Sequence, residues 1–103
     1  PETADFQDFI TRYAWGEVWS RPQLTRQQRS IATLASLITG GHENELRMHV
    51  RAALRNGLTR SEIAEVIQHT ALYAGLPAAN GAMAIMRDVF AEPDTDSEQG
   101  NHG

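Results

Sequence analysis

Apolar residues recur at every third or fourth position along most of the chain, and this spacing is typical of amphipathic helices. It predicts five helical segments, which cover residues 4–15, 25–39, 42–56, 59–74 and 77–90. No stretch has the strict alternation of a strand. We therefore predict an all-α fold, a small helical bundle. In it the third and fourth segments form a helical hairpin, which packs against the second and fifth.

The ends of these segments carry residues that cap or break helices. Thr25 with Gln28, and Thr59 with Glu62, have the spacing of a capping box. In this arrangement each side chain of the pair satisfies a backbone N–H of the other residue. Gly16 is predicted to end the first segment.

The fifth segment differs from the others because it is apolar nearly all round. A helix that is buried on more than one side of so small a domain favours a subunit interface. After it the chain becomes acidic and contains Pro, Ser and Gly. We therefore divide the chain into a folded domain, residues 1–91, and an acidic tail, residues 92–103, which we expect to be flexible.

Composition excludes several kinds of chemistry. The 103 residues include nine basic residues, all of them arginine, and no cysteine. Without lysine there is no Schiff-base mechanism, and without cysteine there are no disulfides, thiolate nucleophiles or zinc-thiolate sites. The net charge of −4 and the absence of a basic block argue against nucleic acid as a partner.

The sequence also carries indications of location. No apolar run approaches the roughly 20 residues of a membrane span, and no signal peptide is visible. We expect a soluble cytoplasmic protein without a membrane partner. The chain does not begin with Met, which is compatible with a domain of a longer protein.

An acid and an imidazole, Glu45 and His49, lie four residues apart in the third segment. Residues at this spacing lie one above the other on a helix, so the pair can share a proton or a small ligand. His49 is a candidate general acid or base, and Glu45 would orient it and raise its pKa. The alternative is a half-buried structural histidine that is hydrogen-bonded to Glu45.

A second histidine, His69, lies between Glu65 and Tyr73 along one line of the fourth segment. If the third and fourth segments form a hairpin, His69 is a second imidazole for the same pocket; otherwise it belongs to a solvated flank. His42 is more typical of a cap or surface position. The spacings of the histidines match no compact ligand motif, so we expect no metal site.

Arginines and aromatic residues supply candidates for binding an anionic ligand. Carboxylates are held well by arginine forks, and the candidates for these are Arg29, Arg47, Arg51 and Arg55. The aromatic residues that could line a pocket, or alternatively belong to the core or an interface, are Trp15, Trp19 and Tyr73. Glu17, between the two tryptophans, is either a carboxylate of raised pKa or a polar surface residue.

Three stretches make the chain resemble the carboxymuconolactone decarboxylase family. They are Trp15-Gly-Glu-Val-Trp19, the run Glu45-Leu-Arg-Met-His49 with its continuation to Gly57, and Tyr73-Ala-Gly-Leu-Pro-Ala-Ala-Asn80. The match extends over nearly all of residues 6–90. Relatives with an alkylhydroperoxidase D-like fold carry Cys-x-x-Cys-x-x-x-His, at positions that are here His42, Glu45 and His49. Only the last is kept, so the resemblance implies the same pocket without its redox chemistry.

The resemblance implies decarboxylation of gamma-carboxymuconolactone to beta-ketoadipate enol-lactone without a cofactor, in the protocatechuate branch of the beta-ketoadipate pathway. It also implies a homo-oligomer, a trimer or hexamer with pockets at subunit contacts. An enol-lactone hydrolase would be fused to the chain or act beside it. The competing class is a non-enzymatic or divergent small-molecule-binding oligomer of the same family.

For the chemistry that the resemblance implies, we assign His49 as the general acid and Glu45 as its orienting partner. His69 or Glu17 could exchange roles with them. The residues assigned to substrate binding are Arg29, Arg51, Trp19 and Tyr73.

Overall fold

The computed structural model describes residues 2–93, and nearly all of this part is helical. Its elements are α1 (Glu2–Ile10), the π-helix η1 (Thr11–Val18), α2 (Arg26–Gly40), α3 (Glu43–Arg55), α4 (Arg60–Ala74) and α5 (Leu76–Phe90). No strand occurs in these residues, which confirms the predicted all-α class. None of these helices is long and apolar enough to cross a membrane. The predicted tail lies outside the described residues, except for Glu92 and Pro93.

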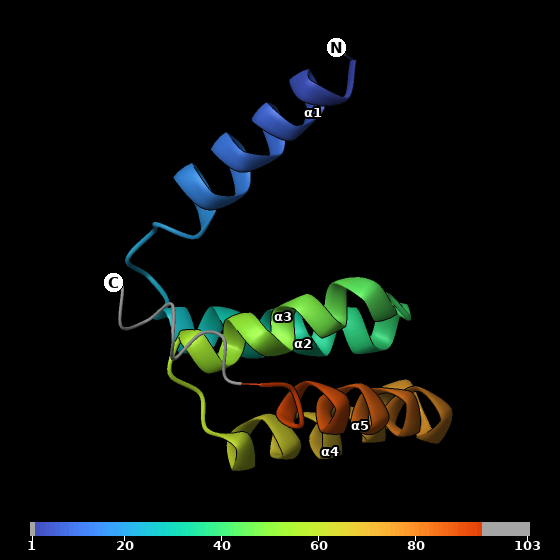
Figure 1. Ribbon diagram of the computed structural model, residues 1–103. Coiled ribbons are helices and arrows are strands. Elements are labelled where there is room, and N and C mark those ends of the chain that lie inside the picture. Colours follow the sequence, from blue (N-terminus) through green and yellow to red (C-terminus); the bar gives the residue numbers. More distant parts are fainter. Residues whose placement is uncertain (1, 94–103) are drawn as a thin grey trace.

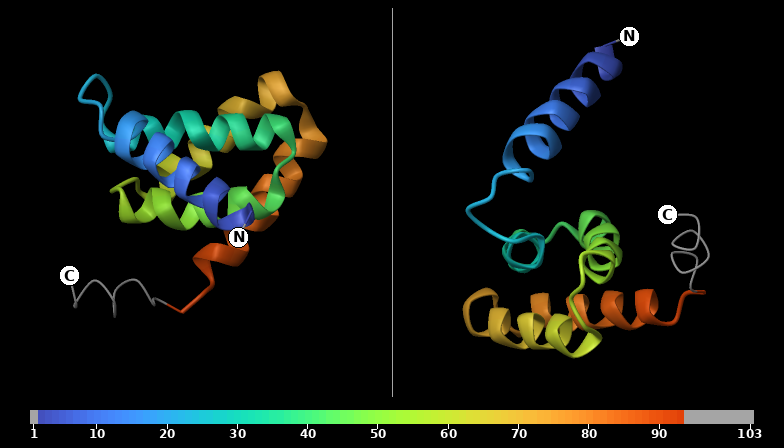
Figure 2. Two further views of the ribbon diagram at one scale, coloured as in Figure 1. Left: turned by 90° about the horizontal axis from the view of Figure 1, so that it is seen from above. Right: turned by 90° about the vertical axis from the view of Figure 1, so that its left-hand side faces the viewer.

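Four of the helices form a bundle of two layers (Figure 1). One layer contains α2 and α3, and the other contains α4 and α5. The right-hand view of Figure 2 shows α2 and α3 nearly end-on while α4 and α5 run across the view, so the two layers cross. Each helix packs mainly on two neighbours, in the cyclic order α2, α3, α5 and α4.

The predicted hairpin of the third and fourth segments is wrong. Although α3 and α4 are consecutive in the chain, they lie diagonally across the bundle and contact each other much less than either contacts α2 or α5. In the connection between them Gly57 has a φ of 102°, and Leu58 then enters the core. The connection therefore carries the chain from one layer to the other instead of folding α4 back along α3.

The bundle core draws apolar side chains from all four helices. Its most completely buried large side chains are Leu34, Val50, Ile63 and Ile67. The contribution of α5 consists of Ala79, Ala82, Ile85, Met86 and Val89. These side chains are buried inside the chain itself, against α3 and α4. The apolar character of α5 therefore reflects its place in the bundle, and the buried side chains are not available to a second subunit, contrary to our reading of the sequence.

Both predicted capping boxes are confirmed. The Gln28 backbone N–H donates to the Thr25 hydroxyl at 3.0 Å, and the Thr25 N–H donates to the Gln28 side chain at 2.8 Å. Thr59 and Glu62 make the same two bonds. An N-cap of this kind contributes about 1 kcal/mol. The two boxes thus fix the start of α2 and α4, which pack against each other.

Gly16 does not end the first helix, contrary to the prediction. The chain continues through it as η1, which ends at Val18. The Trp19 N–H donates to the Ala14 carbonyl at 2.8 Å, which is the five-residue spacing of a π-helix. The Ser20 hydroxyl donates to the Gly16 carbonyl at 2.6 Å. Glycine inside a helix costs only about 1 kcal/mol, so contacts of this kind are enough to offset it.

Together α1 and η1 form an arm that projects from the bundle (Figures 1 and 2). No residue of either helix is buried. The arm approaches the bundle at its η1 end, which is also where the tryptophans lie. The arm therefore has two parts with different surroundings, a free α1 and an η1 that contacts α3.

Met86 gives a test of the core assignment. Met86→Glu places a charge inside the chain's own core, where an unpaired ion costs several kcal/mol. We expect the bundle to lose that much free energy of unfolding, measured by urea denaturation followed by circular dichroism. Ala84→Glu, at an exposed position of the same helix, should change it little. A Met86→Glu chain that dissociates but stays fully folded would contradict the assignment.

Candidate active site

Trp15 joins the arm to the bundle at His49. Its ring stacks on the imidazole of His49, with the ring centroids 6.3 Å apart and the planes inclined by 19°. It also contacts the Trp19 ring, at a centroid distance of 5.1 Å and an angle of 38°. Aromatic rings attract each other at such distances. Trp19 and His49, both predicted from the sequence, are thus brought together around Trp15, and η1 partly covers the imidazole.

A cavity of about 140 Å³ lies beside Trp19 and Arg29, which both line it. Arg29 Nη2 donates to the Arg21 carbonyl at 2.9 Å. Arg29 Nε is buried and has no hydrogen-bond partner within residues 2–93. A buried donor without a partner costs about 1–3 kcal/mol. An anion bound beside Arg29 would satisfy this donor, because guanidinium groups bind carboxylates strongly.

The pKa of His49 lies below its usual value of 6.5. Burial is the largest cause, because it disfavours the charged imidazolium, and the positive charge of Arg55 acts in the same direction. Glu45 raises the pKa, as the sequence predicted, but the other two effects outweigh it. Within the described residues Glu45 makes no hydrogen bond to His49. The surroundings of His49 within the chain therefore favour the neutral imidazole near pH 7.

Ser30 and Asn56 form a polar pair that sequence reasoning missed. Ser30 is buried at 3% exposure, and its hydroxyl accepts a hydrogen bond from Asn56 Nδ2 at 2.9 Å. The bond ties α2, next to Arg29, to the C-terminal end of α3. Ser30 is four residues before Leu34 on the buried face of α2. A hydroxyl in that apolar stripe was the feature of the sequence that could have revealed it.

His69 does not lie with His49. It lines a separate groove of about 350 Å³ between α2 and α4, together with Ile31 and Val66. Its ring contacts Tyr73 at a centroid distance of 5.6 Å and an angle of 48°. The expectation of a shared pocket depended on the hairpin of α3 and α4. Because that hairpin does not form, His69 and Tyr73 belong to another face of the bundle.

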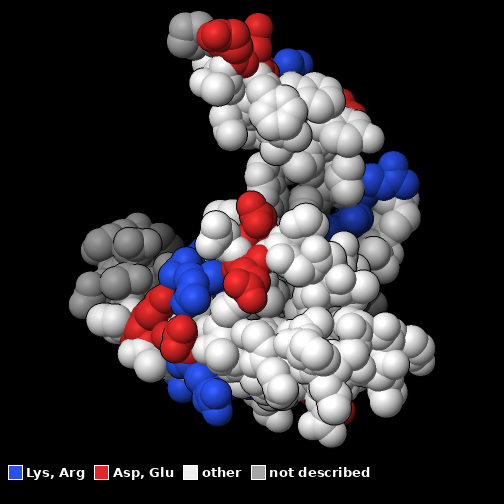
Figure 3. All heavy atoms as spheres, turned by 90° about the vertical axis from the view of Figure 1, so that its right-hand side faces the viewer, with Lys and Arg blue, Asp and Glu red and all other residues white. Residues whose placement is uncertain are grey.

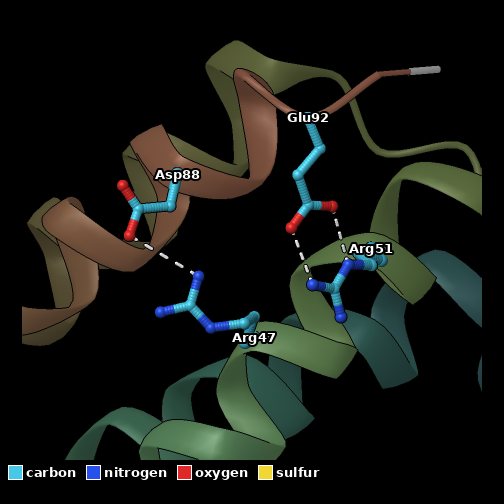
Figure 4. Close-up of polar contacts among 4 residues, drawn as sticks. All are labelled: Arg47, Arg51, Asp88 and Glu92. Carbon is cyan, nitrogen blue, oxygen red and sulfur yellow. Dashed lines mark hydrogen bonds and ion pairs between the residues drawn. The ribbon is translucent and has the colours of Figure 1, made fainter.

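Arg51 also points away from His49. The two residues are two positions apart on α3, which places them about 200° apart around the helix. Arg51 Nε and Nη2 donate to the two carboxylate oxygens of Glu92 at 2.8 and 2.7 Å (Figure 4). Nearby, Arg47 pairs with Asp88 at 3.5 Å. The hydrogen bond from Arg51 is the main reason why the pKa of Glu92 is lowered.

These ion pairs have a structural use. They fasten α5 and the two residues after it to α3 (Figure 4). In the space-filling view, charged side chains gather at one edge of the bundle, and much of the remaining bundle surface on that side is uncharged (Figure 3). The structure therefore shows two donors of Arg51 engaged by Glu92, whereas Arg29 retains a donor without a partner in the described residues.

The remaining candidates lie at the surface. Glu17 is exposed on η1 between Trp15 and Trp19, and makes no side-chain hydrogen bond within residues 2–93. His42 is exposed at the N-terminal end of α3. In the same range, no three His, Asp or Glu side chains come together in a way that could hold a metal ion.

Comparison with known proteins identifies the class. A sequence model described as the carboxymuconolactone decarboxylase family matches residues 4–88. This range takes in nearly all of the arm and of the bundle, and it includes Trp15 and His49. The chain belongs to the carboxymuconolactone decarboxylase family.

Three individual relatives are similar to most of this chain. A 4-carboxymuconolactone decarboxylase of Acinetobacter baylyi is 57% identical over 88 residues, which cover 85% of this chain and 66% of the relative. A nitrosuccinic acid decarboxylase of Metarhizium robertsii is 45% identical over 90 residues, or 87% and 63% of the two chains. An uncharacterized 15.0 kDa protein of Paracoccus denitrificans is 38% identical over 82 residues, or 78% and 61%. The chain thus spans just under two thirds of the length of these relatives.

The opposing charges near His49 can be tested separately. Arg55→Gln removes a positive charge and should raise the pKa of His49, whereas Glu45→Gln removes a negative charge and should lower it. Both shifts can be followed by NMR titration of the imidazole. Arg47→Gln, on the opposite flank of α3, should have little effect. Shifts of the same sign in the first two variants would contradict the electrostatic account.

Proposed function

We propose that this chain catalyses the decarboxylation of gamma-carboxymuconolactone to beta-ketoadipate enol-lactone in protocatechuate catabolism, without a cofactor. The observation that carries the proposal is the unpartnered donor of Arg29, which lines a cavity with Trp19. Trp19 in turn contacts Trp15, which stacks on His49. An anion bound at Arg29 would thus be linked through two aromatic rings to the imidazole of His49. The 57% identity to a 4-carboxymuconolactone decarboxylase supports this substrate.

The reaction needs no external electron acceptor. The carboxylate that is lost sits on the gamma carbon of an alpha,beta-unsaturated lactone. When its C–C bond breaks, the electron pair moves through the double bond into the lactone carbonyl, which gives carbon dioxide and a dienolate. A proton then adds to the alpha carbon. The protein has to hold two carboxylates, stabilise the oxyanion and deliver that proton.

The described geometry supports a role for each group in the cluster. Arg29 would bind a substrate carboxylate through its free donor. His49 would deliver the proton, and Glu45 would favour its charged form. Trp15 and Trp19 would exclude water, which strengthens the electrostatic contacts inside the site. Because a bound dianion stabilises imidazolium, substrate binding itself would raise the pKa of His49 and prepare it as an acid.

The other assigned residues keep a secondary place in this proposal. Glu17 lies on η1 close to both tryptophans in sequence, so it could replace His49 as the proton donor after a small movement of the arm. His69 and Tyr73 line the separate groove between α2 and α4. Arg51 would have to release Glu92 before it could clamp a carboxylate through Nε and Nη2. We therefore favour Arg29 over Arg51 and His49 over His69.

A second substrate follows from the relative named nitrosuccinic acid decarboxylase. A nitro group, like a conjugated carbonyl, can accept the electron pair that carbon dioxide leaves behind. Both substrates carry two carboxylates, so one anion site could serve either. The higher identity to the lactone decarboxylase makes the lactone the preferred substrate. A divergent binding protein of the family would bind such dianions without converting either one.

The setting of this activity is part of the proposal. We place the protein in the cytoplasm as a homo-oligomer, beside or fused to an enol-lactone hydrolase that consumes the product. Neither nucleic acid nor a membrane is a proposed partner.

Loss of synthetic gamma-carboxymuconolactone tests the role of His49. In buffer that contains a chelator, His49→Ala should lower kcat by roughly 10²–10⁴ because the positioned acid is gone, while the helix remains folded. His42→Ala, at the exposed residue just before the same helix, should keep near-normal kcat. If His49→Ala retains near-normal turnover, the role of acid passes to His69 or Glu17. If the chelator abolishes activity and one metal restores it, the cofactor-free proposal fails.

The pH dependence of the rate reports the pKa of His49 in the free enzyme and in its complex with substrate. If His49 must be protonated to act, kcat/KM falls as the pH rises through the pKa of the free enzyme, which lies below 6.5. The matching fall in kcat should occur at higher pH, since the bound dianion raises that pKa. Initial rates over a range of pH and substrate concentration measure both limbs. If kcat and kcat/KM fell at the same pH, the charge of the substrate would not act on His49.

A further inference from the structure

The cavity beside Trp19 has one wall that combines a charged side chain with a hydroxyl group. Arg29 and Thr33 both line it from α2, and residues four apart lie on the same face of a helix. The other lining side chains are Val18, Trp19, Leu24 and Ala32, of which only the indole of Trp19 carries a polar atom. A cavity of this kind fits a ligand with one charged end and an apolar body.

The Thr33 hydroxyl can serve a ligand because the bond that it now makes is replaceable. It donates to the Arg29 carbonyl at 2.8 Å. In the regular bonding pattern of an α-helix the same carbonyl also accepts the backbone N–H of Thr33, so it keeps a partner when the hydroxyl turns away. A hydroxyl rotates to suit its partner. Thr33 can therefore donate to an anion that is bound beside the unpartnered Nε of Arg29.

The reaction makes different demands on the two carboxylates of the proposed substrate. The carboxylate that leaves loses its charge as carbon dioxide forms, whereas the other carboxylate enters the product unchanged. A guanidinium that held the leaving carboxylate would stabilise the ground state more than the transition state, and would thereby raise the barrier. A contact with the retained carboxylate is nearly equal in both states. Such a contact orients the substrate without slowing the reaction.

We propose that Arg29 and Thr33 together bind the carboxylate that the product keeps, which makes Thr33 a substrate-binding residue. The inference rests on the proposed function, because it assigns one end of that substrate to the cavity. The leaving carboxylate then lies away from the guanidinium, where the loss of its charge is not opposed. The apolar part of the lining is left to contact the uncharged part of the substrate.

Binding of the product tests the assignment, because beta-ketoadipate enol-lactone carries only the retained carboxylate. Thr33→Val removes the hydroxyl and nearly keeps the shape of the side chain. This variant should bind the enol-lactone about tenfold more weakly in isothermal titration calorimetry, since a hydrogen bond to a charged group is lost. Thr39→Val, exposed on the same helix outside the cavity, should not change the affinity. Equal affinities of the wild type and Thr33→Val would overturn the proposal.

Steady-state kinetics distinguishes the two carboxylates. If Thr33 holds the retained carboxylate, Thr33→Val should raise KM about tenfold and change kcat by less than about threefold, as expected for a contact of equal strength in both states. A large change in kcat with unchanged affinity for the enol-lactone would place Thr33 on the leaving carboxylate and contradict the proposal. Thr33→Ser, which restores the hydroxyl, should recover most of the lost affinity. If Thr33→Val folds poorly by circular dichroism, Thr33→Ala removes the same hydroxyl.

The proposed function and the role of Thr33 can fail separately. If the wild type does not convert gamma-carboxymuconolactone but binds the enol-lactone in a way that depends on Thr33, the decarboxylase function fails and the carboxylate site stands. If the wild type converts the lactone and Thr33→Val equals it in KM, kcat and product affinity, the function stands and the role of Thr33 fails. A wild type that neither converts the lactone nor binds the enol-lactone would contradict both.

Discussion

The stacking of Trp15 on His49 is the contact on which the rest of the site depends. It holds η1 against α3, and in doing so it contributes to the burial that keeps the imidazole neutral. It also positions Trp19, which closes one side of the cavity beside Arg29. Without this contact the arm would be joined to the bundle mainly through the loop that precedes α2. The arm is therefore attached near Trp15, which covers the imidazole of His49 and leaves α1 projecting from the bundle.

Helix positions could be predicted from the sequence because the residues that fix them are close together. The capping boxes at Thr25 and Thr59 are examples, since each needs only a residue three positions further on. Helix pairing could not be predicted in this way. The short turn at Gly57 is compatible with a hairpin or with a crossing between layers, and the choice depends on how Leu58 and the apolar faces of all four helices pack. The continuation of the first helix through Gly16 was missed for another reason. Glycine is a weak helix former, but local bonds from Trp19 and Ser20 continue the helix past it.

The same distinction applies to the candidate site. Glu45 and His49 lie on one helix, so their proximity follows from spacing alone. Whether His69 joins them depends on how the helices pair, and the spacing of residues along the chain does not decide that. The direction in which the pKa of His49 shifts could not be predicted from the sequence either. Glu45, four residues away, raises this pKa, but burial and the charge of Arg55 lower it by more. The two arginines could be told apart only in the folded structure. Arg29 keeps a donor without a partner in the described residues, whereas Arg51 donates to Glu92.

Two features of the candidate site are unfavourable by themselves, and a dianionic ligand that reached both Arg29 and His49 would relieve both. Arg29 keeps a buried N–H without a partner in the described chain, and the neighbourhood of His49 disfavours its charged form. A dianion supplies an acceptor to the first and an opposite charge to the second. A neutral molecule of the same shape could offer an acceptor but not the charge, so it would leave the imidazole unprotonated. Binding of the charged ligand and protonation of His49 would then be coupled. Proton delivery would be restricted to ligands that carry carboxylates. The site could in this way select its substrate before any bond is broken.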